Sequence, residues 1–228
     1  MKNEVVILFS CICLLSCHEA KQNQSRVDVL PYYNEATFTP HWINPGDNVL
    51  DTFHRISSFT LINQEGKTIT ERSFEDKIYV VDFFFTACPG ICPKLTANMM
   101  DIQEEFLNED DVLLLSHSVT PGRDSVPILK QYAENKGILS KKWHLVTGTQ
   151  KEIYKLGRKD YFIEEDLGLN KKEDEFLHTE NFVLIDKDRR IRGIYNGLSK
   201  TSINQLIADI KTLKMETPLI SSIGSTRL

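Results

Sequence analysis

Apolar and polar positions along this chain follow two different periods, which predict an alternation of β-strands and α-helices. Near-continuous apolar runs cover Lys77–Thr86 and Val112–Thr120, a pattern typical of central strands buried on both faces. Apolar residues at helical spacing predict a final helix over Thr201–Leu213. The other predicted strands are His54–Asn63, Lys67–Thr70, Trp143–Thr147, Asn181–Ile185 and Ile191–Tyr195, and the other predicted helices are Pro93–Asn108, Ser125–Lys136 and Thr149–Gly157.

Turn and cap residues support these boundaries. The runs Gln64–Gly66 and Asp186–Arg189 are turn signals between strands, so each predicts a hairpin. Gly137 is the expected C-cap of one helix, and Thr149 is the expected N-cap of the next. Strands that alternate with helices predict an α/β sandwich with a mixed central sheet and flanking helices, to which an N-terminal hairpin is added.

The composition is that of an ordinary folded protein. The chain has 228 residues, of which 41% are hydrophobic and 26% are charged, and this balance excludes collagen-like, repeat and mostly disordered chains. The net charge of −5 provides no general attraction to nucleic acid, so no nucleic-acid partner is expected.

The first residues are typical of a targeting segment rather than of the fold. Lys2 precedes the apolar run Val5–Leu15, whose length of about eleven residues suits a signal peptide and is too short to span a bilayer. The run ends in Leu14-Leu15-Ser16-Cys17, which resembles a bacterial lipobox, whose cysteine is acylated and becomes the new N-terminus. We therefore expect a lipoprotein signal peptide over residues 1–16 and a lipid on Cys17. Such a protein is anchored to a membrane of the bacterial cell envelope and faces the periplasm.

The remainder divides into a tether, one domain and a tail. Residues 17–45 are polar, contain scattered prolines and lack a clear period, so they are predicted to be a tether of modest order. Within it, four aromatic residues are candidates to dock on the domain: Tyr32, Tyr33, Phe38 and Trp42. The domain is expected over residues 46–216, and residues 217–228 are expected to form a loose tail.

Cysteine positions point to the chemistry. Cleavage before Cys17 would remove Cys11 and Cys13, which leaves Cys88 and Cys92 as the thiols of the mature chain. These two lie between a predicted buried strand and a predicted helix. Functional sites of α/β sheets gather at such strand ends, and the N-terminus of a helix favours thiolate over thiol.

Two chemistries are open to this pair, a disulfide or one bound metal ion. Thioredoxin-type redox sites place two residues between their cysteines, whereas three lie between Cys88 and Cys92. Thiolates are soft ligands that suit Cu(I), and two of them cannot form an all-cysteine zinc site. A metal site therefore requires a histidine.

Six histidines are available for that role. His117 shares the phase of apolar neighbours in a predicted strand, so it is interpreted as a core histidine with its hydrogen bonds satisfied. His178 lies where a charged, loop-like stretch meets a predicted strand, which makes it the strongest candidate ligand. The others are interpreted as tether, surface or packing residues: His18, His41, His54 and His144.

Four motifs in order resemble the Sco/SenC family over about residues 54–213. The motif around the cysteines is the most specific of them. The four are Phe84-Phe85-Thr86-x-Cys88-Pro89-x-x-Cys92-Pro93, Ser118-Val119-x-Pro121-x-x-Asp124, Trp143-x-Leu145-x-Thr147-Gly148 and His178-Thr179.

This resemblance implies a thioredoxin-like fold and a copper metallochaperone. One copper ion, Cu(I) or Cu(II), would be bound by Cys88, Cys92 and His178. The implied role is delivery of copper to the CuA centre of cytochrome c oxidase. The expected partners are the CuA-bearing subunit, a copper donor and a thiol reductant.

The sequence departs from the family pattern at two positions. Many members have aspartate where this chain has Thr120, and aspartate often precedes the histidine where this chain has Leu177. Acids near a metal orient and tune its ligands, so these changes are expected to alter copper affinity or valence preference. Asp124 or the acidic run Glu173–Glu175 would be available to replace them.

Two enzymatic alternatives use the same cysteines. In a thiol–disulfide oxidoreductase, Cys88 and Cys92 would cycle between dithiol and disulfide, with Cys88 as the attacking thiolate. In a peroxiredoxin-like peroxidase, one cysteine of low pKa would react with peroxide. The copper carrier is the preferred reading and needs no enzymatic activity.

Overall fold

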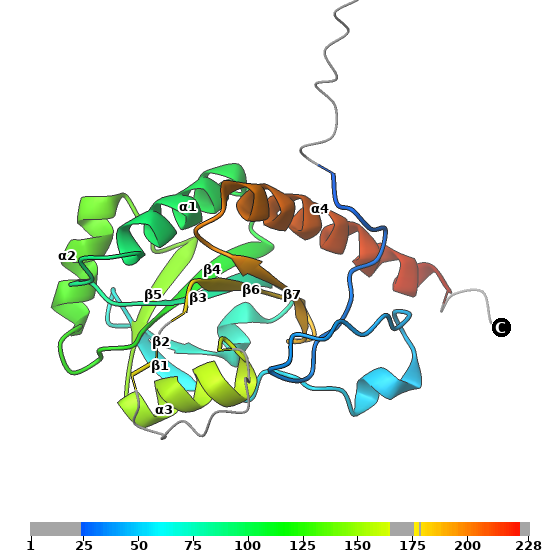
Figure 1. The fold of residues 1–228 in the computed structure, drawn as a ribbon, viewed down its shortest axis with the longest axis horizontal. Helices are drawn as coiled ribbons and strands as arrows, with labels where there is room; N and C mark the ends of the chain where they lie inside the picture. The colour runs from blue at the N-terminus through cyan, green and yellow to red at the C-terminus, as the bar shows by residue number, and fades with distance from the viewer. Residues whose placement is uncertain (1–23, 165–175, 178, 224–228) are drawn as a thin grey trace, which may run out of the picture.

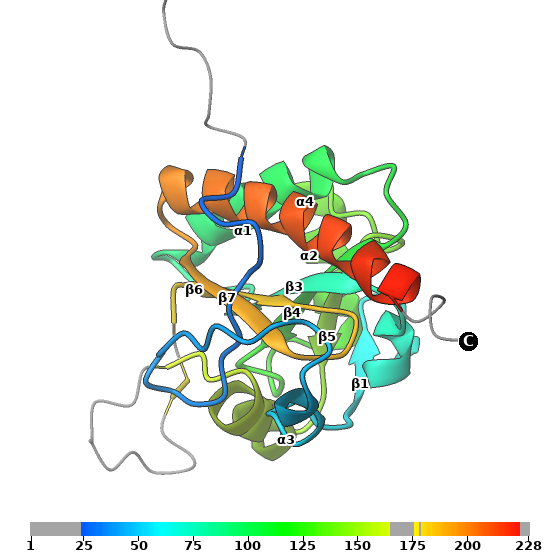
Figure 2. The same ribbon diagram turned by 90° about the vertical axis from the view of Figure 1, so that its right-hand side faces the viewer.

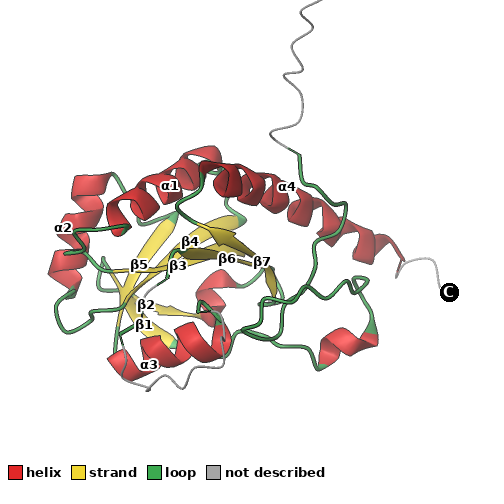
Figure 3. Cartoon of the chain, viewed as in Figure 1, coloured by secondary structure: helices red, strands yellow, loops and turns green. Residues whose placement is uncertain are grey.

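A seven-stranded mixed sheet forms the centre of the molecule, with strand order β2-β1-β5-β4-β3-β6-β7 (Figure 3). The computed structural model describes residues 24–164, 176–177 and 179–223. The sheet confirms the predicted α/β sandwich with a mixed sheet. The strands are β1 (Thr60–Asn63), β2 (Thr68–Thr70), β3 (Ile78–Phe84), β4 (Val112–Ser118), β5 (Trp143–Thr147), β6 (Asn181–Ile185) and β7 (Ile191–Asn196).

Parallel and antiparallel pairs divide the sheet. Strands β3, β4 and β5 are parallel neighbours, and β1-β2 and β6-β7 are antiparallel hairpins at the two ends. In β3 and β4 every residue is buried, as the near-continuous apolar runs predict. The two strands therefore end side by side in the middle of the sheet. The loop after β3 and the loop after β4 consequently start next to each other.

Helices cover both faces of the sheet, as Figure 1 shows. One face packs against α1, α2 and α4, and the opposite face packs against α3 and the loops around it. Each face has its own apolar core. The helices are α1 (Cys92–Glu105), α2 (Val126–Lys136), α3 (Gln150–Lys155) and α4 (Lys200–Ile223), with 3₁₀ turns at Asn48–Asp51 and Glu71–Phe74 and a π-helical turn at Leu156–Asp160.

Both predicted helix caps are present. Gly137 follows α2 with a φ of 75°, in the left-handed region that glycine adopts without strain. The Thr149 side chain accepts a hydrogen bond from the backbone N–H of Glu152 at the start of α3. These local signals therefore set the ends of both helices.

The first predicted strand is shorter than expected, because only its last residues join the sheet as β1. The preceding backbone finds other partners: Ile56 donates to the Arg189 carbonyl, Ser57 donates to Asp160 and Phe59 donates to Glu71. These acceptors lie on loops and side chains far along the chain. The buried residues of the segment 54–59 therefore belong to a loop rather than to a paired strand.

Arg192 attaches the N-terminal segment to the domain. Its guanidinium donates to the carbonyls of Leu30 (2.7 Å) and Pro31 (3.2 Å) and lies 4.0 Å from the centre of the Tyr32 ring. It also pairs with Glu216 on α4 at 2.6 Å. Figure 2 shows the segment passing α4 and reaching the edge of the sheet at β7. Of the four aromatic residues expected to dock, Tyr32 is buried at 3% exposure, whereas the expectation is wrong for Trp42, which is 64% exposed.

The last helix is longer than the sequence predicts. Helix α4 continues to Ile223 rather than ending at Leu213, so residues 217–223 of the predicted loose tail are helical. The buried pair of Glu216 with Arg192 holds the helix on the domain beyond Leu213. Within the described residues, no helix has both the length and the apolar composition needed to cross a bilayer. The predicted signal peptide and Cys17 lie outside those residues.

Candidate metal centre

The loop that joins β3 to α1 leads from Phe84 to Cys92 and contains Cys88. Cys88 is half-buried and Cys92 is 5% exposed, and both are free thiols. Cys92 is the first residue of α1, so its position is set by the helix and the core beneath it. The loop residues around Cys88 are exposed. The Cys88 sulfur lies 4.0 Å from the place where a Cβ on Gly90 would stand.

The two thiols differ in acidity. Burial acts to raise the pKa of the Cys88 thiol, but hydrogen bonds from the Cys92 side chain and from the N–H groups of Cys92, Gly90 and Ile91 outweigh it, so its pKa lies below the usual value. Burial, together with the hydrogen bond and charge of Cys88, raises the pKa of Cys92 to about 12. Cys88 is therefore the more acidic of the two thiols.

Asp124 binds the start of this loop. Its carboxylate accepts hydrogen bonds from the Thr86 hydroxyl (2.6 Å), the Thr86 N–H (3.2 Å) and the Ser118 hydroxyl (2.6 Å). Thr120, at the first position of departure from the family pattern, donates its hydroxyl to the same carboxylate at 3.1 Å. An aspartate at position 120 could not donate this bond when ionised. Asp124 thus contacts Thr86 rather than a cysteine.

Leu177, at the second departure, is a core residue. It is fully buried, and a Cβ on Gly157 would stand 2.7 Å from its Cδ2 atom and 3.2 Å from the Phe83 ring. Phe176 makes an edge-to-face contact with Phe85, with ring centroids 5.7 Å apart. The two residues before position 178 thus pack against residues of β3 and of the loop after it. His178 itself and the acidic run Glu173–Glu175 lie outside the described residues.

Gly157 allows the close approach of Leu177. Gly157→Ala is expected to lower the free energy of unfolding by about 1–3 kcal/mol, because the added methyl group overpacks the core around Leu177. Chemical denaturation measures this change. Gly122→Ala is the matched control, since a Cβ there meets nothing within 4 Å. Equal effects of the two substitutions would contradict the packing argument.

None of the described histidines forms a site together with the two cysteines. His117 is fully buried and stacks on Phe83 with centroids 4.8 Å apart, and burial lowers its pKa to about 3. Its place in the core is as predicted, but neither ring nitrogen has a hydrogen-bond partner among the described residues. The prediction that the hydrogen bonds of His117 are satisfied was wrong, because aromatic rings surround its imidazole. His54 and His144 each contact a neighbouring loop or strand.

Asp82 is a residue near the site that the sequence reasoning missed. It interrupts the apolar run of β3, is 2% exposed, and accepts a hydrogen bond from Ser116, which in turn accepts one from Trp143 at 2.7 Å. Burial raises the pKa of Asp82 to about 7, although the Ser116 hydrogen bond opposes this. Its charge is one of the influences that raise the pKa of Cys92. The sequence signal that could have identified Asp82 is an acidic residue inside an otherwise apolar strand.

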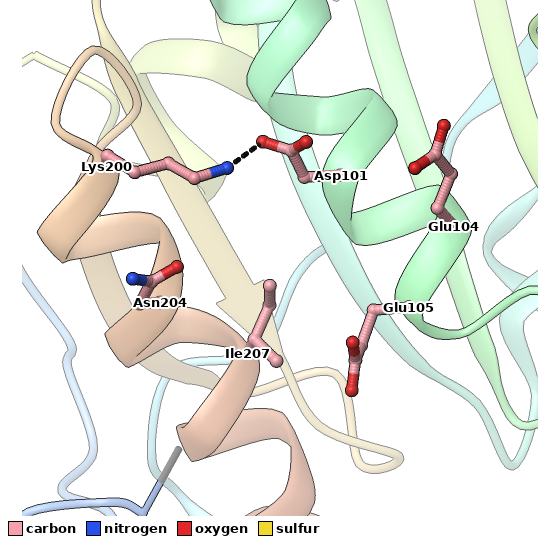
Figure 4. A pocket seen from close by; sticks show the side chains of 6 residues that line it. All are labelled: Asp101, Glu104, Glu105, Lys200, Asn204 and Ile207. Carbon is pink, nitrogen blue, oxygen red and sulfur yellow. Dashed lines mark hydrogen bonds and ion pairs between the residues drawn. The ribbon is translucent and has the colours of Figure 1, made fainter. Parts of the chain in front are cut away.

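A surface pocket lies elsewhere, between α1 and α4. Figure 4 shows the residues that line it, which are Asp101, Glu104 and Glu105 of α1 and Lys200, Asn204 and Ile207 of α4, with an ion pair between Lys200 and Asp101. These α1 residues belong to the end of the helix opposite Cys92. Across the described part of the chain, no three His, Cys, Asp or Glu side chains gather closely enough to hold a metal ion. The cysteine pair is thus a two-sulfur donor set that needs a further ligand.

Comparison with known proteins identifies relatives of this chain. The family model described as SCO1/SenC matches residues 49–215. The structure of BsSco, a member of the Sco family of cytochrome c oxidase assembly proteins with a disulfide switch, is 32% identical, covers 71% of this chain and 94% of its own, and has a TM-score of 0.61. A SCO1/SenC family lipoprotein from Bacillus anthracis is 30% identical, with coverages of 71% and 95% and a TM-score of 0.62.

A third solved structure contains copper. Arabidopsis thaliana ScoI with copper bound is 25% identical, covers 70% of this chain and 98% of its own, and has a TM-score of 0.52. Together with the BsSco structure, it confirms the thioredoxin-like fold that the resemblance implied.

Proposed function

The chain belongs to the SCO1/SenC family, and from this premise we propose that it is a membrane-anchored copper metallochaperone for cytochrome c oxidase. It binds one copper ion through Cys88, Cys92 and His178. It passes that ion to the CuA-bearing subunit, so copper is its cargo. A copper donor and a thiol reductant complete the set of partners.

The observation that carries this proposal is the pair of free thiols at the start of α1. Cys88 and Cys92 are hydrogen-bonded to each other, and the pKa of Cys88 is lowered, which favours its soft thiolate form. Soft thiolates favour Cu(I) over harder divalent ions. A half-buried Cys88 leaves a bound ion within reach of a partner's ligands.

Contacts made by the residues before and after position 178 support His178 as the third ligand. Phe176 packs on Phe85 and Leu177 packs near Phe83, and both partners belong to the segment that leads into the cysteine loop. After position 178, the Thr179 hydroxyl donates to the Ile163 carbonyl at 2.7 Å. The chain segments before and after His178 are therefore attached to the same end of the domain.

The membrane anchor is proposed from the sequence of residues 1–17. A lipid on Cys17 would hold the protein at a membrane of the bacterial envelope, on the periplasmic side. The relative from Bacillus anthracis is described as a lipoprotein, which supports this assignment. Because Arg192 binds Leu30 and Pro31 to the domain, the tether would meet the domain near residue 30.

Thiol–disulfide exchange is the second candidate function. The unequal acidity of Cys88 and Cys92 suits a pair in which one thiolate attacks and the other thiol resolves. The BsSco structure is described as containing a disulfide switch. A copper carrier must itself be kept reduced, so the two functions are compatible.

His178→Ala separates the two candidates. In an anaerobic Cu(I) titration, the wild type is expected to bind one equivalent, and His178→Ala is expected to bind at least about tenfold more weakly, since one ligand is lost. Thiol–disulfide exchange with a small disulfide should continue in the variant. His144→Ala is the control, because His144 lies on β5 and contacts Asn63 rather than the cysteine loop. Unchanged copper affinity in His178→Ala would rule out this histidine as a ligand.

A further inference from the structure

Asp124 is a buried carboxylate that has no positively charged partner within the described part of the chain. It is 1% exposed, and none of the ion pairs formed within the described residues includes it. Among the described residues, its hydrogen-bond donors are three hydroxyls and one backbone N–H. Removing an ionised carboxylate from water is costly, so the arrangement calls for an explanation beyond packing.

Both oxygens of this carboxylate are directed at Thr86. The Thr86 hydroxyl donates to Oδ1 at 2.6 Å and the Thr86 N–H donates to Oδ2 at 3.2 Å. The last backbone bond between the parallel strands joins the Val119 N–H to the Phe84 carbonyl. The contact with Asp124 therefore continues the attachment of the chain two residues beyond the end of β3.

The two cysteines differ in what holds them. Cys92 is fixed by α1 and by the core below it. Cys88 lies two residues after Thr86, in exposed backbone whose nearest turn bond joins the Cys88 N–H to the Phe85 carbonyl at 3.3 Å. The Asp124–Thr86 contact attaches the Cys88 side of the loop at its start, in addition to the hydrogen bonds that the Cys88 sulfur accepts and its packing against the core.

We propose that Asp124 is a positioning residue that acts through Thr86 to hold Cys88 beside Cys92. The inference rests on the proposed function, which assigns copper binding to the two cysteines. The relative position of the two sulfurs matters whether or not copper is bound. A loop ordered in advance loses less conformational entropy when its sulfurs bind one ion or join in a disulfide.

Thr86→Val is the cleanest test. It removes the hydroxyl donor at nearly constant volume, whereas Asp124→Ala would leave several donors without an acceptor and would confound the result with instability. Thr86→Val is expected to weaken Cu(I) binding about tenfold, the lower end of the range for residues that support metal ligands. Thr86→Ser keeps the hydroxyl and should restore binding to within about twofold of the wild type.

A copper-free measurement keeps the proposal independent of the proposed function. At equilibrium with glutathione, each protein molecule that forms the Cys88–Cys92 disulfide gives up two protons and two electrons and reduces one glutathione disulfide to two glutathiones. Thr86→Val should lower this equilibrium constant about tenfold, which corresponds to a potential about 30 mV less negative. Thr86→Ser should again match the wild type.

Tyr154→Phe controls for simple loss of stability. The Tyr154 hydroxyl donates to the Val119 carbonyl at 3.1 Å, so this variant removes one buried hydroxyl bond from the β4–α2 loop that carries Asp124, without touching Asp124 itself. Its copper affinity and disulfide equilibrium should equal those of the wild type. The proposal is overturned if Thr86→Val leaves both measurements unchanged, or if Tyr154→Phe shifts them equally. If no variant binds copper but Thr86→Val still shifts the disulfide equilibrium, the positioning role stands and the proposed function fails.

Discussion

Cys88→Ser and Cys92→Ser are each expected to weaken Cu(I) binding by roughly 100-fold or more. A four-ligand structural zinc site contributes about 10–16 kcal/mol, or roughly 3 kcal/mol for each ligand, and roughly 3 kcal/mol corresponds to about two powers of ten in affinity. Serine offers a hydroxyl that stays protonated and is a hard donor, so it cannot replace a thiolate toward Cu(I).

The two serine variants should differ in stability. Cys88 is half-buried in an exposed loop, whereas Cys92 is 5% exposed and belongs to the core under α1. Cys92→Ser places a hydroxyl in that apolar core and is expected to lower the melting temperature, while Cys88→Ser leaves it close to that of the wild type.

Competition with a coloured Cu(I) chelator under anaerobic conditions measures both affinities. Ala87→Ser serves as the control, because it adds a hydroxyl to the exposed loop and leaves both sulfurs in place. A single-cysteine variant that retained the wild-type affinity would show that copper binds elsewhere.

Asp82 is expected to make the protein less stable as the pH rises from about 4 to about 7. Burial raises the pKa of this carboxyl from 3.8 to about 7 in the folded state. Below pH 4 both states carry the proton and the group has no effect. Between the two values the unfolded chain has released its proton while the folded protein keeps it, so folding is opposed by about 1.4 kcal/mol for each pH unit. The contribution totals about 4 kcal/mol.

Asp82→Asn isolates this contribution from other titrating groups. The asparagine carbonyl can still accept the Ser116 hydrogen bond, but the side chain does not ionise. Denaturant unfolding at several pH values should show that the stability difference between variant and wild type moves in favour of the variant by about 4 kcal/mol from pH 4 to pH 7. Identical pH profiles for the two proteins would show that the folded-state pKa of Asp82 is close to its ordinary value.

This acid also affects the cysteine site. The charge of Asp82 contributes to the raised pKa of Cys92, so its ionisation above about pH 7 disfavours a second thiolate. The buried acid and the cysteine pair therefore lie in one electrostatic environment. No sequence motif indicated this link.

Local patterns in the sequence were sufficient for much of the fold. Strands β5 (Trp143–Thr147) and β6 (Asn181–Ile185) have the predicted bounds. The caps Gly137 and Thr149 lie where they were expected. The cysteine loop joins a buried strand to a helix, as predicted. Such features depend on period, turn residues and backbone propensity, which act between residues only a few positions apart.

Interactions between distant parts of the chain decided the rest. The contacts of Asp124 with Thr86, of Arg192 with Leu30 and of Leu177 with Gly157 each join segments that the sequence separates. The early residues of the first predicted strand bind loops instead of a strand for the same reason. The sequence by itself determined which elements form and where the cysteine pair lies between them. Only the tertiary structure decided how acidic those thiols are and what holds them, because burial and hydrogen bonding depend on neighbours that no local pattern specifies.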